Sequence, residues 1–154
     1  MKLDLNSPVT LNKSFDLVLN FGTAEHIFNV AQLFQTIHIY TKPDGHMIHG
    51  VPFSGWVDHG FFNFQPTFFW DLAAANNYYV ELVIYAELNP FKILRISDRD
   101  TILAMANAGE IGKNSLLYFV LRKFHEEHEF RVPIQGYYNG NISDQAIKAW
   151  KSLR

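Results

Sequence analysis

The chain contains no cysteine, little charge and no long hydrophobic run. Without cysteine, neither a disulfide nor a reactive thiol can contribute to the fold or the function. Charged residues make up 18% of the 154 residues and the net charge is −2, whereas about 25% is typical of a globular domain. No block of lysine and arginine is present, so nothing in the charge pattern indicates nucleic-acid binding.

No segment reaches about 18 consecutive apolar residues, the length that a membrane-spanning helix requires. The first residues, MKLDLNSPVTLNKSFD, are too polar for the apolar region of a signal peptide. We therefore expect a protein without membrane contact that is located in the cytoplasm, either of the cell that makes it or of a host cell. The length predicts a single domain over residues 1–154.

Aromatic residues are abundant in the chain. They make up 16% of it, including 14 phenylalanines, and 48% of all residues are hydrophobic. A domain of this size buries only part of such a set, and an aromatic surface with little charge is typical of the centre of a protein interface. The composition therefore favours an aromatic-lined groove or a surface that binds a protein partner.

The spacing of apolar residues predicts a mixture of strands and helices. Strands are expected over residues 14–20, 36–41, 46–50, 61–64, 78–87, 91–96 and 130–134. Helices are expected over residues 23–34, 67–75, 101–108, 114–127 and 143–150. Pro43-Asp44-Gly45 predicts a turn that makes a hairpin of the strands around it. Because long helices do not separate most strands, the pattern favours an α+β fold over a parallel α/β sheet.

The histidines do not form a recognisable metal-binding pattern. His46 and His49 are three residues apart on a predicted strand, so their side chains point to opposite faces of it. His125 and His128 are neighbours on a predicted helix, but metalloprotease histidines are four residues apart. Nothing close in sequence completes a site around His26. The sequence therefore predicts no metal site.

Five segments between residues 36 and 98 form a pattern that resembles a known family. They read IHIYT at 37–41, FFNFQP at 61–66, DLAAA at 71–75, YVEL at 79–82 and NPFKIL at 89–94. In this order they resemble the small ADP-ribosyltransferase-like domains of bacterial toxins, effectors and phage proteins. The resemblance implies an α+β fold with a split, mostly antiparallel sheet, four to five flanking helices and NAD bound in the cleft.

The resemblance also implies roles for particular residues. The NAD-binding residues would be His38, Thr41, His49, Phe62, Phe64 and Tyr79, with His38 and His49 as rivals for the ribose contact. The catalytic residues would be His38 and either Glu129 or Gln135. Cleavage of the glycosidic bond develops positive charge on the ribose, and a carboxylate held against it would stabilise the transition state.

Two functions are therefore open at this point. The resemblance implies an NAD-dependent mono-ADP-ribosyltransferase that modifies a host macromolecule. The composition favours a non-enzymatic binding or inhibitor module that contacts a protein partner through an aromatic-rich surface.

Overall fold

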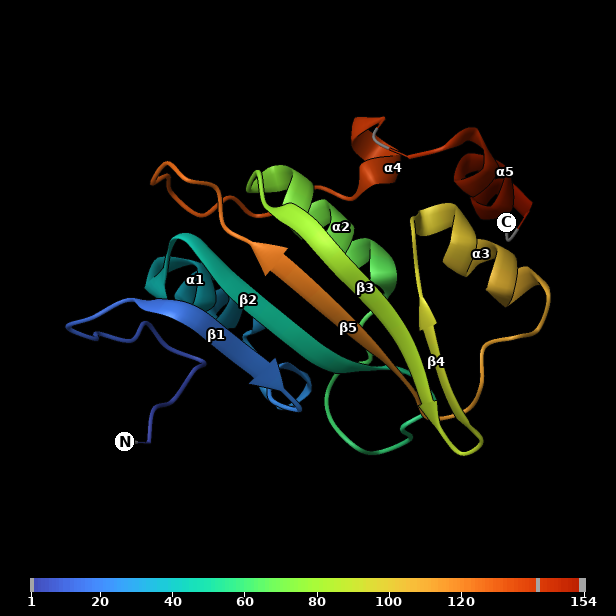
Figure 1. Cartoon of the computed structure of the whole chain (residues 1–154), viewed down its shortest axis with the longest axis horizontal. Coiled ribbons are helices and arrows are strands. Elements are labelled where there is room, and N and C mark those ends of the chain that lie inside the picture. The colour runs from blue at the N-terminus through green and yellow to red at the C-terminus, as the bar shows by residue number, and fades with distance from the viewer. Residues whose placement is uncertain (1, 141, 153–154) are drawn as a thin grey trace.

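The computed structural model describes residues 2–140 and 142–152, and the strands in these residues form one mixed sheet. The strands are β1 (Phe15–Phe21), β2 (Thr41–Ser54), β3 (Tyr79–Leu88), β4 (Phe91–Arg95) and β5 (Ser115–Arg122). Their spatial order is β1-β2-β5-β3-β4 (Figure 1). β1 is parallel to β2, and every other pair is antiparallel. The α+β class is therefore confirmed, whereas the expected split antiparallel sheet is corrected to one continuous mixed sheet.

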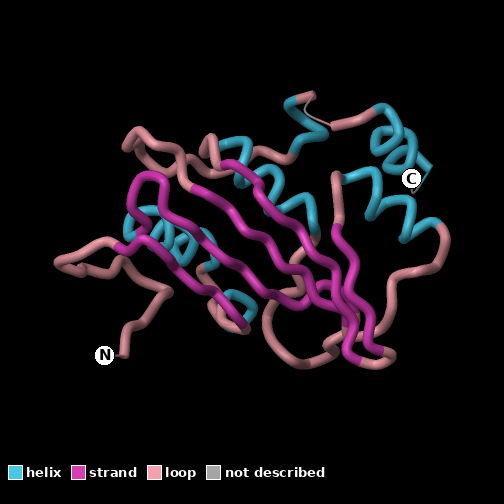
Figure 2. The backbone as a smooth tube through the Cα atoms, viewed as in Figure 1, coloured by secondary structure: helices cyan, strands magenta, loops and turns pink. Residues whose placement is uncertain are grey.

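The helices of the described residues are found beside and behind this sheet. They are α1 (Val30–Tyr40), α2 (Pro66–Ala75), α3 (Arg99–Asn107), α4 (Gly136–Asn139) and α5 (Asp144–Ser152), with a short 3₁₀ turn η1 (Ala24–His26) before α1. α1 and α2 lie behind the sheet in the view of Figure 2, and α3 packs beside α5 near one edge. None of the described helices has the length and apolar character that a membrane crossing requires.

Aromatic rings join α1 and α2 to the centre of the sheet. Phe69 of α2 stacks on Phe119 of β5, with ring centroids 4.7 Å apart. Phe34 of α1 reaches the same place and lies 5.9 Å from the Phe69 ring. All three side chains are buried. Aromatic rings bury more apolar surface than other side chains, so their burial contributes strongly to the stability of a small domain.

A buried lysine connects the end of β5 to the end of α1. The ammonium group of Lys123 donates hydrogen bonds to the main-chain carbonyls of His38, at 3.0 Å, and Thr41, at 2.9 Å. It also lies 3.3 Å from a carboxylate oxygen of Glu127. Carbonyls at the end of a helix have no partner within that helix, and a cation there is stabilised by the helix dipole. Lys123 thus donates hydrogen bonds to main-chain carbonyls at the junction between α1 and β2.

The segment predicted as a strand over residues 36–41 is instead the end of α1, apart from Thr41, which begins β2. Its β-branched residues favour a strand, but Leu33, Phe34 and Ile37 form one buried helical face against the sheet. The helix begins at Asn29, whose side chain accepts a hydrogen bond from the amide of Gln32, and not at Thr23. Burial of that face therefore outweighs the local strand preference.

Residues 43–45 do not form a hairpin turn. β2 runs through them without reversing, and the turn residues make a bulge at which the register with β1 shifts. Asp44 adopts a positive φ of 59° there, a conformation that Asp tolerates better than most residues. The predicted strand at 46–50 is therefore the middle of β2.

The predicted helix over residues 114–127 is also wrong, since this segment contains β5. Leu117, Phe119 and Leu121 are buried, and the residues between them are half-buried, as in a strand with two apolar faces. The predicted strands at 61–64 and 130–134 are extended loops. The structure confirms the predicted elements at 14–20, 67–75, 78–87, 91–96, 101–108 and 143–150, with small shifts of their ends.

The position of Lys123 gives a stability prediction. Lys123→Met removes the charge and the hydrogen bonds that it donates to two buried carbonyls. We therefore expect the free energy of unfolding in urea to fall by about 2 to 4 kcal/mol. Lys42→Met is the matched control, because it breaks only the surface ion pair with Asp16. We expect that control to cost less than about 1 kcal/mol. Equal losses in the two variants would contradict the role of Lys123.

Candidate functional site

The candidate site is the face of the sheet opposite α1 and α2, which we call the open face. No helix in the described part of the chain covers it, and it faces the viewer in Figure 1. Alternation along the strands and the register between them place a single set of side chains there. The set is Leu17, Leu19, Phe21, His46, Ile48, Gly50, Pro52, Tyr79, Glu81, Leu82, Ile84, Ala86, Leu88, Phe91, Ile93, Arg95, Leu116, Tyr118, Val120 and Arg122.

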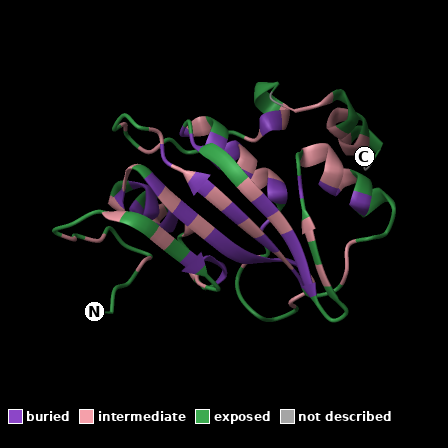
Figure 3. Ribbon diagram, viewed as in Figure 1, coloured by how far each residue is buried: buried purple, intermediate pink, exposed green. Residues whose placement is uncertain are grey.

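Large apolar side chains on the open face are accessible to solvent. Leu19 of β1 is 55% exposed, Phe21 is 53% exposed and Ile93 of β4 is 55% exposed. Figure 3 shows the resulting bands of exposed and half-buried residues along the strands. A sheet with one solvated face ordinarily carries polar residues on that face. A solvated sheet face with this many apolar side chains therefore indicates a binding surface.

Two aromatic rings lie side by side on the open face. Phe21 of β1 reaches Tyr118 of β5 edge to face, with ring centroids 6.1 Å apart. The strand between them carries Gly50, and a Cβ at that position would lie 2.6 Å from the Tyr118 ring and 2.9 Å from the Phe21 ring. Gly50 therefore allows the two rings to meet edge to face across β2.

The charged groups at one end of the open face form a closed network. The Arg122 guanidinium donates to Glu81, at 2.7 Å, and to Asp44, at 2.9 Å, and lies 4.1 Å from the Tyr79 ring centroid. His46 lies 3.0 Å from the second Glu81 oxygen. The hydrogen bond from Arg122 holds the pKa of the Glu81 carboxyl below its usual range. These groups satisfy one another, so none needs a ligand to neutralise it.

The imidazole of His38 is a structural group in the helix-covered half of the molecule. It lies on α1, not on a strand, and is buried. One ring nitrogen lies 2.8 Å from the main-chain carbonyl of His128, so it must carry the proton, and the other accepts from the Tyr78 hydroxyl at 2.6 Å. Both nitrogens are therefore occupied.

His49 and Thr41 are also enclosed by the fold. His49 lies on the covered side of β2 between the rings of Phe34 and Phe69, and its Nδ1 lies 3.1 Å from the amide nitrogen of Asn20. The Thr41 hydroxyl donates to the carbonyl of Ile37 at 2.7 Å. His46 points to the other side of β2, which confirms that these two strand histidines cannot share an ion.

The remaining residues of the implied NAD site lie in separate places. Phe64 is in the core and Phe62 packs beside it, whereas Tyr79 lies under Arg122 on the open face. Glu129 follows β5 in a loop and lines a hollow that His38 also lines. Gln135 lines a different pocket, between α2, α3 and α5. The structure thus brings His38 and Glu129 to one hollow and Phe62 beside Phe64, but it does not gather the implied residues into one site.

Two features were missed by the sequence analysis. The open face is one, because its residues come from all five strands and only the register brings them together. The other is a group of Glu25, His26 and His59, whose ligand atoms lie within 4.8 Å of one another. The expected helical pair His125 and His128 lies in a loop instead.

The buried histidines give a prediction for acid stability. Burial lowers the pKa of His38 to about 4 and that of His49 to about 3. An unfolded chain binds these protons near pH 6.5, so below about pH 6.5 the unfolded state takes up protons that the native state does not. We expect the free energy of unfolding to be greatest above about pH 6.5 and to fall with decreasing pH, by up to about 1.4 kcal/mol per pH unit for each histidine. Urea denaturation between about pH 7 and pH 5 measures this slope, and a flat profile would contradict it.

Protein-family models and curated proteins were compared with this chain. No protein-family model matches it, and no curated protein shows a significant match. Function is therefore inferred from the chain's own geometry.

Proposed function

We propose that this chain is a non-enzymatic binding module and that the open face is its binding surface. The observation that supports this function is a continuous apolar sheet face, with exposed leucine, isoleucine and phenylalanine side chains, that no described helix covers. Exposing apolar surface of this kind to water costs free energy, and that free energy is regained when a partner covers the surface.

We propose that the partner is a second copy of the chain. The sheet is five strands wide and β5 is 8 residues long, so at the usual spacings the face measures roughly 24 by 26 Å, or about 600 Å². Two such faces would bury about 1,200 Å², which is the lower limit for a stable interface, and side chains at the rim add to it. The face alone is therefore large enough for a dimer.

The charge of the open face also suits a second copy. Its two cations, Arg95 and Arg122, are balanced by Glu81 on the face and by Asp44, which pairs with Arg122 at the end of the face. A face without net charge does not repel an identical face, and the apolar residues that surround the network provide the contact. Such a dimer would be isologous, with the two sheets face to face and the helices outside.

A charged residue on the β1 side of this surface should separate the copies. Leu19→Lys places an ammonium group at a position that is 55% exposed in the single chain and covered in the dimer. Burying it without a partner costs several kcal/mol. We expect the wild type to have twice the 17.8 kDa mass of one chain in sedimentation equilibrium, and the variant to have the mass of one.

The matched control is Ile39→Lys on α1, an aliphatic side chain that is 51% exposed on the opposite side of the molecule. It should leave the dimer intact. A wild type that stays monomeric at about 100 μM, or a Leu19→Lys variant that stays dimeric, would overturn the proposal.

NAD-dependent ADP-ribosyl transfer is the second candidate function that we propose. One observation favours it: His38 and Glu129, the pair that the resemblance assigns to the ribose, line the same hollow. Under this proposal NAD raises the melting temperature of the protein, and Glu129→Ala removes both the shift and NAD turnover. Glu126→Ala is the control, because Glu126 belongs to the same loop but does not line the hollow. Absence of any NAD-dependent shift in the wild type would eliminate this candidate.

A further inference from the structure

We propose that Glu25, His26 and His59 form a binding site for a divalent transition-metal ion, at the end of β1 and beside the open face. A carboxylate and two imidazoles are a donor set that binds zinc and related ions. This site does not depend on the proposed dimer or on NAD.

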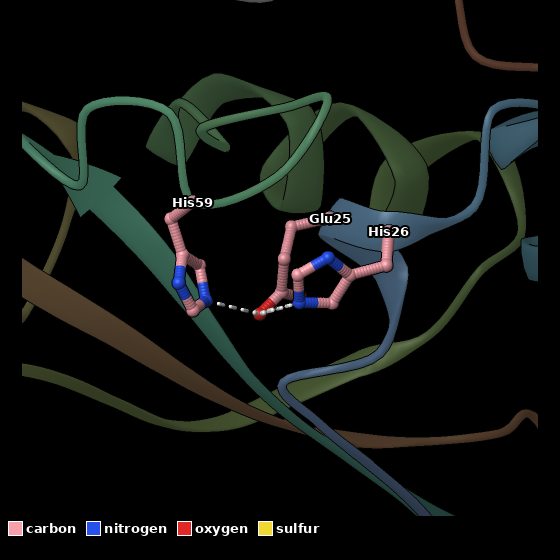
Figure 4. A group of neighbouring side chains, drawn as sticks. All are labelled: Glu25, His26 and His59. Carbon is pink, nitrogen blue, oxygen red and sulfur yellow. Dashed lines mark ion pairs between the residues drawn. The ribbon is translucent and has the colours of Figure 1, made fainter.

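The three donors converge on one point. The Oε1 atom of Glu25 lies 3.9 Å from Nε2 of His26 and 3.8 Å from Nε2 of His59. Figure 4 shows both imidazole rings turned toward this oxygen, with one ring on each side of it. Donors bound to a tetrahedral zinc ion at about 2.0 to 2.1 Å lie roughly 3.3 Å apart. The two distances to Glu25 thus exceed that spacing by about half an ångström, and the two histidine donors lie within 4.8 Å of each other. A small inward movement of the side chains would therefore complete the coordination.

The carboxylate of Glu25 has an unused oxygen. Its side chain is only 2% exposed, and Oε2 is buried without a hydrogen-bond partner among the described residues. A buried carboxylate oxygen that accepts no hydrogen bond is costly, because the water that it loses is not replaced. A cation bound by both carboxylate oxygens would replace that water.

The loop that carries His59 is fixed in place before any ion binds. The main-chain amide and the indole nitrogen of Trp56 donate to Asn114 and Ser115 at the start of β5, at 2.8 and 2.9 Å. On the other side of His59, the amide of Phe61 donates to the Glu25 carbonyl at 2.7 Å. Gly60 permits this approach, since a Cβ there would lie 2.8 Å from the same carbonyl oxygen. The loop and η1 are thus joined beside the three donors.

Three protein ligands leave a fourth position of a tetrahedral ion open. Glu25 and His59 also line a pocket of about 380 Å³, and the same pocket is lined by Gly50, Leu116 and Tyr118 of the open face. A small ligand or a donor group of a partner that enters this pocket could reach the fourth position. The site therefore has the form of an accessible metal centre, not of a closed structural one.

Metal titration tests this site directly. The full chain, freed of metal with a chelator, is titrated with ZnCl₂ by calorimetry, and Co²⁺ is added separately to record the visible absorption of a bound ion. We expect one ion per chain, a higher melting temperature with zinc and a Co²⁺ spectrum of low coordination number. We expect His59→Ala to weaken binding at least about 100-fold, because loss of even an outer-shell partner costs about 10- to 100-fold.

The chain supplies a matched control. His46 is a second partly exposed histidine beside a glutamate, 40% exposed against 42% for His59, so His46→Ala should leave zinc binding unchanged. Glu25→Gln keeps the shape of the buried side chain and should also weaken binding. Absence of stoichiometric binding in the wild type, equal weakening by His46→Ala and His59→Ala, or tight binding that survives both His59→Ala and Glu25→Gln would overturn the assignment.

Discussion

The stack of Phe69 on Phe119 holds α2 against the central strand of the sheet, and the rest of the molecule is arranged around that contact. β5 lies between β2 and β3, so a helix anchored to β5 covers the middle of the sheet. Phe34 of α1 contacts the Phe69 ring and so joins the second helix to the same cluster. Because both helices are attached on one side, the hydrophobic core is complete on that side alone. The apolar residues on the other side remain accessible.

The two sides of the sheet use polar groups differently. On the covered side, Lys123, His38 and His49 are buried, and their hydrogen bonds go to main-chain carbonyls or to neighbouring side chains. Removing such groups leaves unpaired atoms in a low-dielectric interior, so they act as structural connections. On the open side, the charged groups pair with one another at the end of the sheet and leave its centre apolar. A surface of that kind suits recognition by shape and apolar contact.

The sequence predicts correctly those elements whose apolar residues recur with a single clear period, either that of a strand or that of a helix. Residues 78–87 alternate clearly and form β3 as predicted, and the capping residue Asp98 begins α3. The segment 114–127 fails because a central strand is apolar on both faces and therefore loses the alternation that would distinguish it from a helix. The segment 36–41 fails because burial against the sheet outweighs the local preference of its isoleucines and threonines.

The candidate sites are less predictable than the elements. Glu25 and His26 are adjacent in the sequence, but only the loop anchored by Trp56 brings His59 to them. No spacing rule contains that information, because the distance is closed by tertiary contacts. The open face is likewise a product of strand register, which places residues from both halves of the chain on one surface.

Gly50 limits how the aromatic pair above it can vary. A methyl group at this position would lie less than 3 Å from both the Phe21 and Tyr118 rings, so alanine would be accommodated only if one ring moved away or were replaced by a smaller side chain. Substitutions at these three positions are therefore expected to be interdependent. A related sequence with a side chain at position 50 should therefore have lost one of the two rings.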